Sequence, residues 1–286
     1  MRNVRFLILT CITLLSWHCY AQRYEVGIAG MGTGYMGDIN PQNTLYIKSL
    51  GGGIFSKYNF SPTWGARLSV NYLHLQGQDR DFNNELQNTR NLSFQNRITE
   101  FSLMGEFNFY TIFNKKRQQT PNFTPYIFAG IGILNHDPYV RYGGQRVRLN
   151  PLRLEYDEIS NPTIYSTWNM LLPFGVGIKH NLKNSWAIGA EISYRLAFTD
   201  NLDNVSKYYA TSIPQYLRVP NVEIKDGDVT RKFGIEDWEY LADPSGNLFT
   251  NAGLARGDGK TKDGYMTIGI TLTYSILSTD CFSWRK

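Results

Sequence analysis

Long apolar runs are missing from most of this 286-residue chain. After residue 21 there is no stretch of about 18 uncharged apolar residues, which is the length that a membrane-spanning helix needs. The mean hydropathy of −0.34 is also low for a helical membrane protein. We therefore exclude helical membrane spans beyond the N-terminal segment.

The chain also has few cysteines and a small net charge. The chain has three cysteines, and Cys11 and Cys19 lie within the first 21 residues, which we expect to be cleaved. Cys281 alone then remains, so neither an internal disulfide nor a cysteine metal cluster can form. Removal of Arg2 and Arg5 lowers the formal charge from +5 to +3. Because this charge is small and dispersed, we expect no nucleic-acid partner.

The first 21 residues have the parts of a secretory signal. Arg2 and Arg5 precede an apolar run from Phe6 to Trp17, and Ala21 provides a small residue at the cleavage site. We expect cleavage after Ala21, so that residues 1–21 are a signal peptide and 22–286 form the mature domain. The alternative is an uncleaved anchor, although the run is too short to span a membrane.

The chain is rich in aromatic residues, at 14%, and in segments where apolar and polar residues alternate. In the stretch from Ser185 to Asp200, every second residue is apolar, and Trp186 and Tyr194 belong to this set. The residues between them are small or charged, such as Glu191 and Arg195. A period of two indicates a β-strand with unlike faces. Lipid outside and a crowded polar lumen inside produce this pattern in a membrane barrel.

Seven further segments alternate in the same way, each about the length of a tilted membrane strand, roughly nine to eleven residues or somewhat more. An even total of eight lets an antiparallel barrel return both termini to one side. The sequence therefore predicts an all-β fold, an eight-stranded antiparallel up-and-down transmembrane β-barrel. The seven segments are Tyr24 to Gly30, Gly51 to Phe60, Trp64 to Leu75, Ile98 to Phe113, Pro125 to Leu134, Trp168 to Leu182 and Gly264 to Leu277.

The connections between the eight segments alternate between short or moderate and long. Outer-membrane barrels alternate in this way because one rim faces the periplasm and the other faces outward. We therefore expect an outer-membrane protein in contact with lipid, with short periplasmic turns, four long extracellular loops and both termini in the periplasm. The predicted loops are Met31 to Ser49, Gln76 to Arg97, Asn135 to Thr167 and Asn201 to Asp263.

Proline interrupts one of the predicted strands. Pro173 lies inside the segment from Trp168 to Leu182. Because proline has no N–H to donate to a neighbouring strand, we expect either a bulge at Pro173 or a strand that begins later than Trp168.

Eight charged residues share the inward parity, four acids and four bases. Side chains just fill an eight-stranded barrel, and unpaired buried charges are costly. We therefore predict an ion-pair network without a sizeable pore, and we expect no large stable conductance in a planar bilayer. The alternative is a path for protons or ions. The residues are Glu25, Glu100, Glu106 and Glu191 with Lys57, Arg67, Lys179 and Arg195.

The sequence contains no clear motif for catalysis or metal binding, and we predict no catalytic, cofactor-binding or metal-binding residues. His74 and His136 fall near the expected outer rim, as in barrel enzymes that act on lipid A, so a lipid-modifying enzyme remains an alternative. Asp226, Asp228 and the segment from Asp258 to Asp263 offer oxygens for calcium. Their spacing does not match an EF-hand loop, and solvated turns are the simpler interpretation.

Three groups of residues, spread over most of the mature chain, form strand and loop signatures. They are Tyr24 to Ile28 with Gly34 to Asn40, then Tyr194-Arg195 with Phe198 to Ser206, and then Arg256-Gly257 with Asp263 to Tyr265 and Thr271 to Tyr274. Together they resemble the PorG-like outer-membrane β-barrel family of Bacteroidetes.

This resemblance implies a role in the type IX protein secretion system, which is tied to gliding motility. It implies a non-enzymatic scaffold that links the outer membrane to a periplasmic ring of PorK and PorN subunits. We predict that Lys115, Lys116 and Arg117, in the turn from Asn114 to Thr124, contact that ring. The alternative for these residues is solubility and anchoring near anionic headgroups. The competing function is a surface receptor or adhesin that uses the loop Asn201 to Asp263.

Overall fold

The structure is a computed structural model. It describes residues 23–41, 46–61, 63–82, 85–109, 123–157, 162–182, 185–213, 223–226 and 228–276. The predicted signal peptide, the basic residues Lys115, Lys116 and Arg117, and Cys281 lie outside the described residues.

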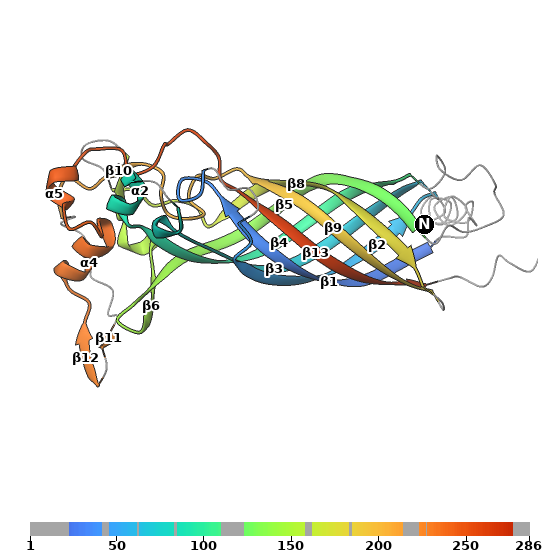
Figure 1. The fold of residues 1–286 in the computed structure, drawn as a ribbon, viewed down its shortest axis with the longest axis horizontal. Coiled ribbons are helices and arrows are strands. Elements are labelled where there is room, and N and C mark those ends of the chain that lie inside the picture. Colours follow the sequence, from blue (N-terminus) through green and yellow to red (C-terminus); the bar gives the residue numbers. More distant parts are fainter. Residues whose placement is uncertain are drawn as a thin grey trace, which may run out of the picture.

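Eight long antiparallel strands form a closed barrel (Figure 1). Each strand pairs with the next barrel strand along the chain, and the last, β13, pairs back with the first, β1. The predicted up-and-down barrel is confirmed. Its strands are β1 (Arg23–Met36), β2 (Ser49–Asn59), β3 (Trp64–Gln78), β4 (Ser93–Asn108), β5 (Phe123–Tyr142), β8 (Trp168–Asn181), β9 (Trp186–Ala197) and β13 (Gly264–Ile276).

Several strands extend further than the alternating pattern predicted. β1 continues to Met36 rather than Gly30, β5 continues to Tyr142 rather than Leu134, and β4 begins at Ser93 rather than Ile98. Burial still alternates in the extension of β4, but its exposed residues Ser93 and Arg97 are polar. The extension of β1 lies where the long connections cover the barrel, so that residues of both parities are enclosed there. From Thr33 to Tyr35, for example, every residue is buried. Alternation in polarity marks a strand only where its two faces meet different media.

Pro173 produces neither a bulge nor a later start, so both of those expectations were wrong. β8 begins at Trp168, and its register against β5 is the same on both sides of the proline, with Phe174 opposite Ala129 and Leu171 opposite Gly132. The β5 ladder is interrupted between these two pairs, whereas Pro173 still pairs with Arg195 of β9. The strand therefore accommodates the missing N–H by losing ladder bonds on one side.

The barrel wall is apolar outside and polar inside. Outward side chains such as Ile28, Leu68 and Ile270 are exposed, whereas their inward neighbours are buried. Aromatic side chains form contacts around the end with the short turns, as in the girdles of membrane barrels. Three of these contacts are Tyr24 with Tyr58, Trp64 with Phe107, and Trp186 with Tyr274, whose ring centres are 5.1, 4.8 and 5.0 Å apart.

The four long connections form a folded cap at the other end of the barrel, on the left in Figure 1. The cap is defined here as the described residues of 37–48, 79–92, 143–167 and 198–263. Among the described residues, no helix is long and apolar enough to cross a membrane. The cap elements are α2 (Glu85–Arg90), α4 (Ile235–Ala242), α5 (Leu248–Asn251), β6 (Gln145–Arg148), β7 (Glu155–Tyr156), β10 (Tyr208–Tyr209), β11 (Glu223–Asp226), β12 (Val229–Lys232) and the 3-10 turns Asp79–Asp81 and Asn150–Leu152.

An apolar core holds the cap together. The interior of the cap is therefore apolar, whereas the interior of the barrel is polar. Trp238 of α4 is fully buried, and its Nε1 donates a hydrogen bond to the carbonyl oxygen of Leu152 at 2.8 Å. Leu202 and Val205 belong to the same cluster, which continues into the barrel rim. The cap and the rim therefore share one core.

Candidate functional site

The inward charged residues form three groups along the barrel axis, and the first lies near the short turns. Lys57 of β2 forms an ion pair with Glu106 of β4, and its Nζ is 3.6 Å from Oε2 of Glu25. Lys179 of β8 places its Nζ 2.9 Å from the same oxygen. Asn59 donates to the other carboxylate oxygen of Glu25 at 3.0 Å. Two acids and two bases from four strands thus neutralise one another.

The second group crosses the middle of the lumen. Arg67 of β3 forms an ion pair with Glu191 of β9, and these strands lie on opposite sides of the barrel. The hydroxyl of Tyr126 donates to the same Glu191 oxygen at 2.7 Å. The guanidinium carbon of Arg67 lies 4.0 Å from the centre of the Phe55 ring, so the charge also gains a cation–π contact.

The third group is centred on Glu100, whose side chain is fully buried. Its carboxylate accepts from Arg195 Nε at 2.7 Å, from the Tyr265 hydroxyl at 2.8 Å, from Asn71 Nδ2 at 3.0 Å and from Ser102 Oγ at 3.1 Å. A buried carboxylate with several donors and a cationic partner meets the condition under which such a charge is tolerated.

These groups fill the lumen. A void between the second and third groups has a volume of about 10 Å³ and is lined by Arg67, Glu191 and Arg195, among others. Such a space holds about one water molecule. The structure thus brings all eight inward charges of the sequence analysis into ion pairs, and side chains of the described strands occupy the place where a pore would run.

The two histidines considered for an enzyme do not meet. His74 of β3 lies on the outward face beside the ring of Tyr72, with ring centres 5.5 Å apart. His136 of β5 is turned inward and fully buried, where its ring stacks on Tyr165 and its Nε2 lies 3.0 Å from Asn169 Nδ2. The barrel wall separates the two imidazoles, so they do not form one site.

Sequence reasoning missed an acidic cluster in the cap. Carboxylate oxygens of Asp38, Asp200 and Asp258 lie within 4.8 Å of one another. Burial raises the pKa of Asp38 to about 7, and the neighbouring acids raise it too, against a backbone hydrogen bond from Asp258 that lowers it. Burial also raises the pKa of Asp200 to about 6. We assign no metal to this cluster, because grouped acids alone are not specific for one.

Two further acids of the cap are fully buried and share one phenol. The Tyr35 hydroxyl oxygen lies 2.6 Å from Asp203 Oδ2 and 2.7 Å from Asp263 Oδ1. Burial raises the pKa of both carboxyls well above the usual value, and the nearby acids add to the effect. Tyr35 is the penultimate residue of β1, whereas the two aspartates flank the segment 204–262. This contact therefore fastens that segment to the barrel rim.

Gly37 leaves the space that this contact needs. A Cβ at this position would lie 2.0 Å from both the Tyr35 hydroxyl oxygen and Asp263 Oδ1, which is far closer than real Cβ atoms approach. The sequence shows a glycine there, but only the structure shows that it allows the close approach.

Two arginines, Arg256 and Arg90, cross-link the cap connections. Arg256 forms an ion pair with Glu155 at 2.8 Å and donates to the carbonyl oxygens of Asn204 and Ala242. Arg90 forms two hydrogen bonds with the carboxylate of Asp79 and donates to the carbonyl oxygen of Arg256. Segments far apart in the sequence are thereby held in one unit.

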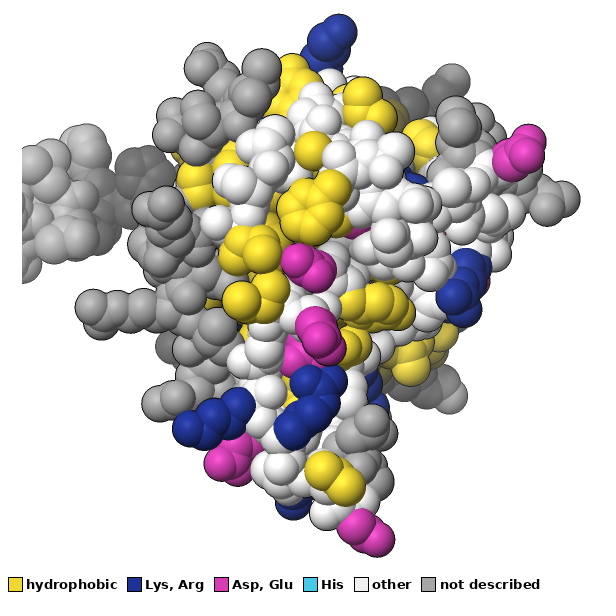
Figure 2. Space-filling model, turned by 90° about the vertical axis from the view of Figure 1, so that its left-hand side faces the viewer, with side chains coloured by type: hydrophobic (Ala, Val, Ile, Leu, Met, Phe, Trp, Pro, Cys, Tyr) yellow, Lys and Arg dark blue, Asp and Glu magenta, His cyan; other side chains and the backbone are white. Residues whose placement is uncertain are grey.

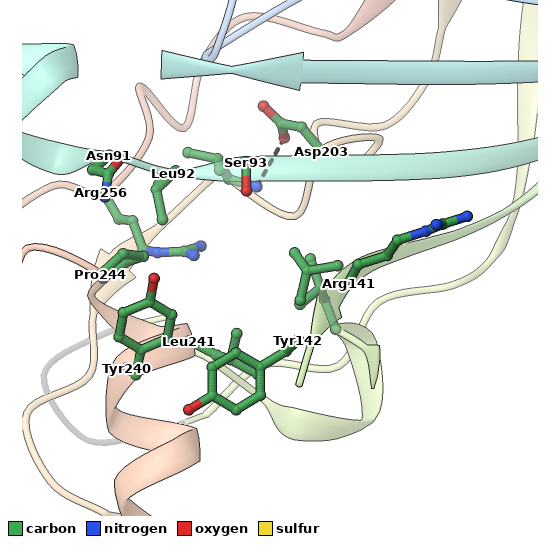
Figure 3. A pocket seen from close by; sticks show the side chains of 13 residues that line it. Asn91, Leu92, Ser93, Arg141, Tyr142, Asp203, Tyr240, Leu241, Pro244 and Arg256 are labelled. Carbon is green, nitrogen blue, oxygen red and sulfur yellow. Dashed lines mark hydrogen bonds between the residues drawn. The ribbon is translucent and has the colours of Figure 1, made fainter. Parts of the chain in front are cut away.

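A pocket of about 110 Å³ opens between three of the cap connections (Figure 3). The guanidinium of Arg256 reaches into it from one side, and Asp203 lies on the opposite wall. The rings of Tyr142 and Tyr240 lie on a third side, stacked with their centres 5.4 Å apart. A cation beside aromatic faces offers both a hydrogen-bond donor and a stacking surface to a small ligand.

An apolar exterior, an ionic lumen, short turns at one end and long connections at the other define the class of eight-stranded outer-membrane β-barrels. Within that class, the chain belongs to the family described as "Domain of unknown function (DUF6089)", whose model matches residues 3–237. No curated protein matches the chain.

The chain also resembles solved outer-membrane proteins in fold. A major outer membrane protein from Thermus thermophilus is 13% identical, with a TM-score of 0.43, over 90% of this chain and all of that one. Ail, the attachment invasion locus protein of Yersinia pestis, is 10% identical, with a TM-score of 0.38, over 89% of this chain and all of that one. OprG from Pseudomonas aeruginosa is 8% identical, with a TM-score of 0.36, over 91% and 98%. Likenesses this remote indicate nothing about binding or activity.

Proposed function

We propose that the protein is a non-enzymatic outer-membrane anchor, and specifically a scaffold of the type IX secretion machinery that links the membrane to periplasmic ring subunits of the PorK and PorN type. The filled lumen carries this proposal. All eight inward charges are paired, and the void between two of the groups has room for about one water molecule. A barrel filled in this way acts through its surfaces rather than as a channel.

The residues that resemble the PorG-like barrels support the specific assignment, because they meet in space. Tyr35 and Asp38 come from the first group, Asp203 comes from the second, and Arg256 and Asp263 come from the third. Tyr35 bonds to Asp203 and Asp263, and Asp38 accepts hydrogen bonds from the backbone of Asp258, two residues after Arg256. The resemblance therefore lies in residues that connect the barrel rim to the cap.

The proposed orientation places the short turns in the periplasm and the cap outside the cell. Tyr24 near the start of β1 pairs with Ile276 at the end of β13, so both ends of the barrel sheet lie on the side of the short turns. In this orientation the end of β4 at Asn108 and the start of β5 at Phe123 face the periplasm, and Lys115, Lys116 and Arg117 fall between them in the sequence.

Replacement of Lys115, Lys116 and Arg117 by alanine is expected to abolish co-purification of the ring subunits. The reason is that loss of three clustered cations removes their electrostatic complementarity to a ring surface. The measurement is pull-down from solubilised membranes, with secretion of a reporter followed in parallel. Lys225, Lys232 and Lys260 are exposed cap residues, and their joint replacement by alanine is the matched control. Ring subunits that co-purify equally with both variants would refute the contact and favour anchoring near anionic headgroups.

The cap pocket favours a surface receptor as the second candidate function. Tyr208, Phe249 and Leu254 are also exposed on the cap, and Figure 2 shows apolar side chains gathered beside acidic ones on this end. Exposed apolar patches of this kind often mark contact surfaces.

Replacement of both Tyr142 and Tyr240 by serine separates the two functions. Under the scaffold proposal, secretion and ring co-purification stay at the wild-type level, because the pocket lies at the opposite end of the barrel from the ring contact. The measurement is complementation of a strain that lacks the gene. Normal secretion in the strain without any copy of the gene would instead leave the receptor as the better assignment.

A further inference from the structure

The contact of Tyr35 with Asp203 and Asp263 contains more acceptors than the phenol can serve. A phenol carries one hydrogen, so it donates to one carboxylate at a time. Both carboxyl oxygens nevertheless lie within hydrogen-bond distance of the phenol oxygen, at 2.6 and 2.7 Å. Two ionised carboxylates on one phenol oxygen would leave one of these short contacts without a hydrogen.

The other oxygen of each carboxyl group is already in use. Asp203 Oδ1 accepts from the backbone N–H of Val205, and Asp263 Oδ2 accepts from the backbone N–H of Leu202, both at 2.8 Å. A further proton therefore belongs on one of the two oxygens that face Tyr35. The protonated carboxyl then donates to the phenol oxygen, and the phenol donates to the second carboxylate.

We propose that Tyr35, Asp203 and Asp263 share one proton in addition to the phenolic hydrogen, and that loss of this proton as the pH rises releases the described residues of 204–213 and 228–262 from the barrel rim. The cap thereby acts as a proton-sensitive lid on the long-connection end. This inference does not depend on the secretion role, since it concerns only the joint between the cap and β1.

The charges around this joint favour retention of the proton. Asp38 and Glu155 act on Asp203, and Asp200 acts on Asp263. Two cations close to the joint are already engaged by other acids, Arg256 by Glu155 and Arg90 by Asp79, and Lys262 acts on Asp200. Tyr194 and Tyr165 also face the pair from β9 and from the connection before β8, and they are neutral. The acids at the joint therefore outnumber the cations that are available to neutralise them.

The direction of the pH effect follows from these charges. Because burial raises the pKa of Asp203 and Asp263 in the closed cap, the closed form holds a proton that the open form releases. Closure is thus favoured at low pH and weakens as the pH rises from the ordinary carboxyl pKa of 3.8 toward the raised value. Over that window, one released proton increases the equilibrium constant for opening about tenfold per pH unit.

Hydrogen exchange of the full-length barrel in detergent micelles tests this inference. The measured quantity is the protection factor of peptides from 204–213 and 228–262, corrected for the intrinsic rate at each pH, between about pH 5 and about pH 9. In wild type, we expect protection in these peptides to fall with rising pH while the barrel strands remain protected. Raised pKa values of Asp38 and Asp200 contribute to the same slope, so variants must isolate the shared proton.

Asp263→Asn provides this isolation, because the amide donates permanently to the phenol oxygen while its carbonyl oxygen accepts from Leu202. We expect its protection to fall less steeply than that of wild type, by about one factor of ten per pH unit. Asp203→Asn has the same geometry and gives a second, independent variant. The matched control is Asp157→Asn, since the Asp157 side chain is 56% exposed in the same part of the cap and, within the described part of the chain, forms its ion pair with Lys207.

Infrared difference spectroscopy gives a second measurement that is independent of folding stability. At neutral pH, wild type should show the carbonyl band of a protonated carboxylic acid, and this band should be weaker in Asp263→Asn, where only Asp38 and Asp200 still contribute to it. Equal slopes in wild type and both asparagine variants would overturn the proposal. So would the absence of this band together with loss of cap protection when a chelator is added, since a cation rather than a proton would then join the two carboxylates.

Discussion

Glu100→Ala is expected to lower the free energy of unfolding by about 3–5 kcal/mol. Removal of the carboxylate leaves the guanidinium of Arg195 buried without its anion, and it also takes an acceptor from Tyr265 and Asn71. The cost comes mainly from the charge that remains, because a lone ion in a low-dielectric interior loses its hydration without compensation. The measurement is urea unfolding in detergent, followed by the gel mobility of unboiled samples.

The double variant Glu100→Leu with Arg195→Met is the matched control for that experiment. Replacing both partners of a buried ion pair by apolar residues of similar volume is often neutral or stabilising. We therefore expect the double variant to lie much closer to wild type than the single variant does. If Glu100→Ala unfolded at the same urea concentration as wild type, water would have to reach Arg195, and the lumen would not be filled as described.

The alternating segments allowed the barrel to be predicted because lipid and lumen impose opposite requirements on neighbouring residues. That rule placed Glu100 and Arg195 on the inward face from parity alone. It did not identify them as partners, because β4 and β9 face each other across the lumen and parity contains no information about distance around the barrel. Pairing depends on strand order, tilt and stagger, which the closed structure supplies.

The cap was the part that sequence reasoning missed. The segment from Ile235 to Ala242 does contain a helical signal, since Trp238, Leu241 and Ala242 recur at the spacing of one helix face and Asp237 lies in the first turn. That signal lies within the predicted extracellular loop from Asn201 to Asp263. The joint at Tyr35 had no local signal, because its partners lie 168 and 228 residues away in the sequence.

Buried acids and bases are balanced in the lumen but not at the joint between the cap and the barrel. In the lumen, acids and bases are equal in number and pair across the barrel, so the network needs no proton to balance it. At the joint below the cap, Asp38, Asp200, Asp203 and Asp263 gather where Arg90 and Arg256 are already paired. We therefore expect the cap to respond to rising pH through this joint, and peptide-level exchange follows the cap separately from the barrel strands.

Ile270→Arg is expected to destabilise the barrel by about 2–4 kcal/mol in a lipid bilayer. Ile270 lies near the middle of β13, faces away from the lumen and is 62% exposed. Were water outside the wall, arginine would extend into solvent at almost no cost, as surface substitutions usually change stability by no more than about 0.5 kcal/mol. A lipid exterior instead forces the guanidinium to leave water near the bilayer midplane.

Val229→Arg is the matched control for Ile270→Arg, because Val229 is 63% exposed but lies on β12 of the cap. The two variants exchange an aliphatic residue of nearly equal exposure for the same cation, so the difference between them isolates the medium that each side chain meets. Both are refolded into phosphatidylcholine vesicles and unfolded in urea or guanidinium chloride, with the unboiled gel band as the signal. We expect a large loss for Ile270→Arg and little change for Val229→Arg. Equal stability of the two variants would show that water surrounds the wall, and the outer-membrane assignment would then be wrong.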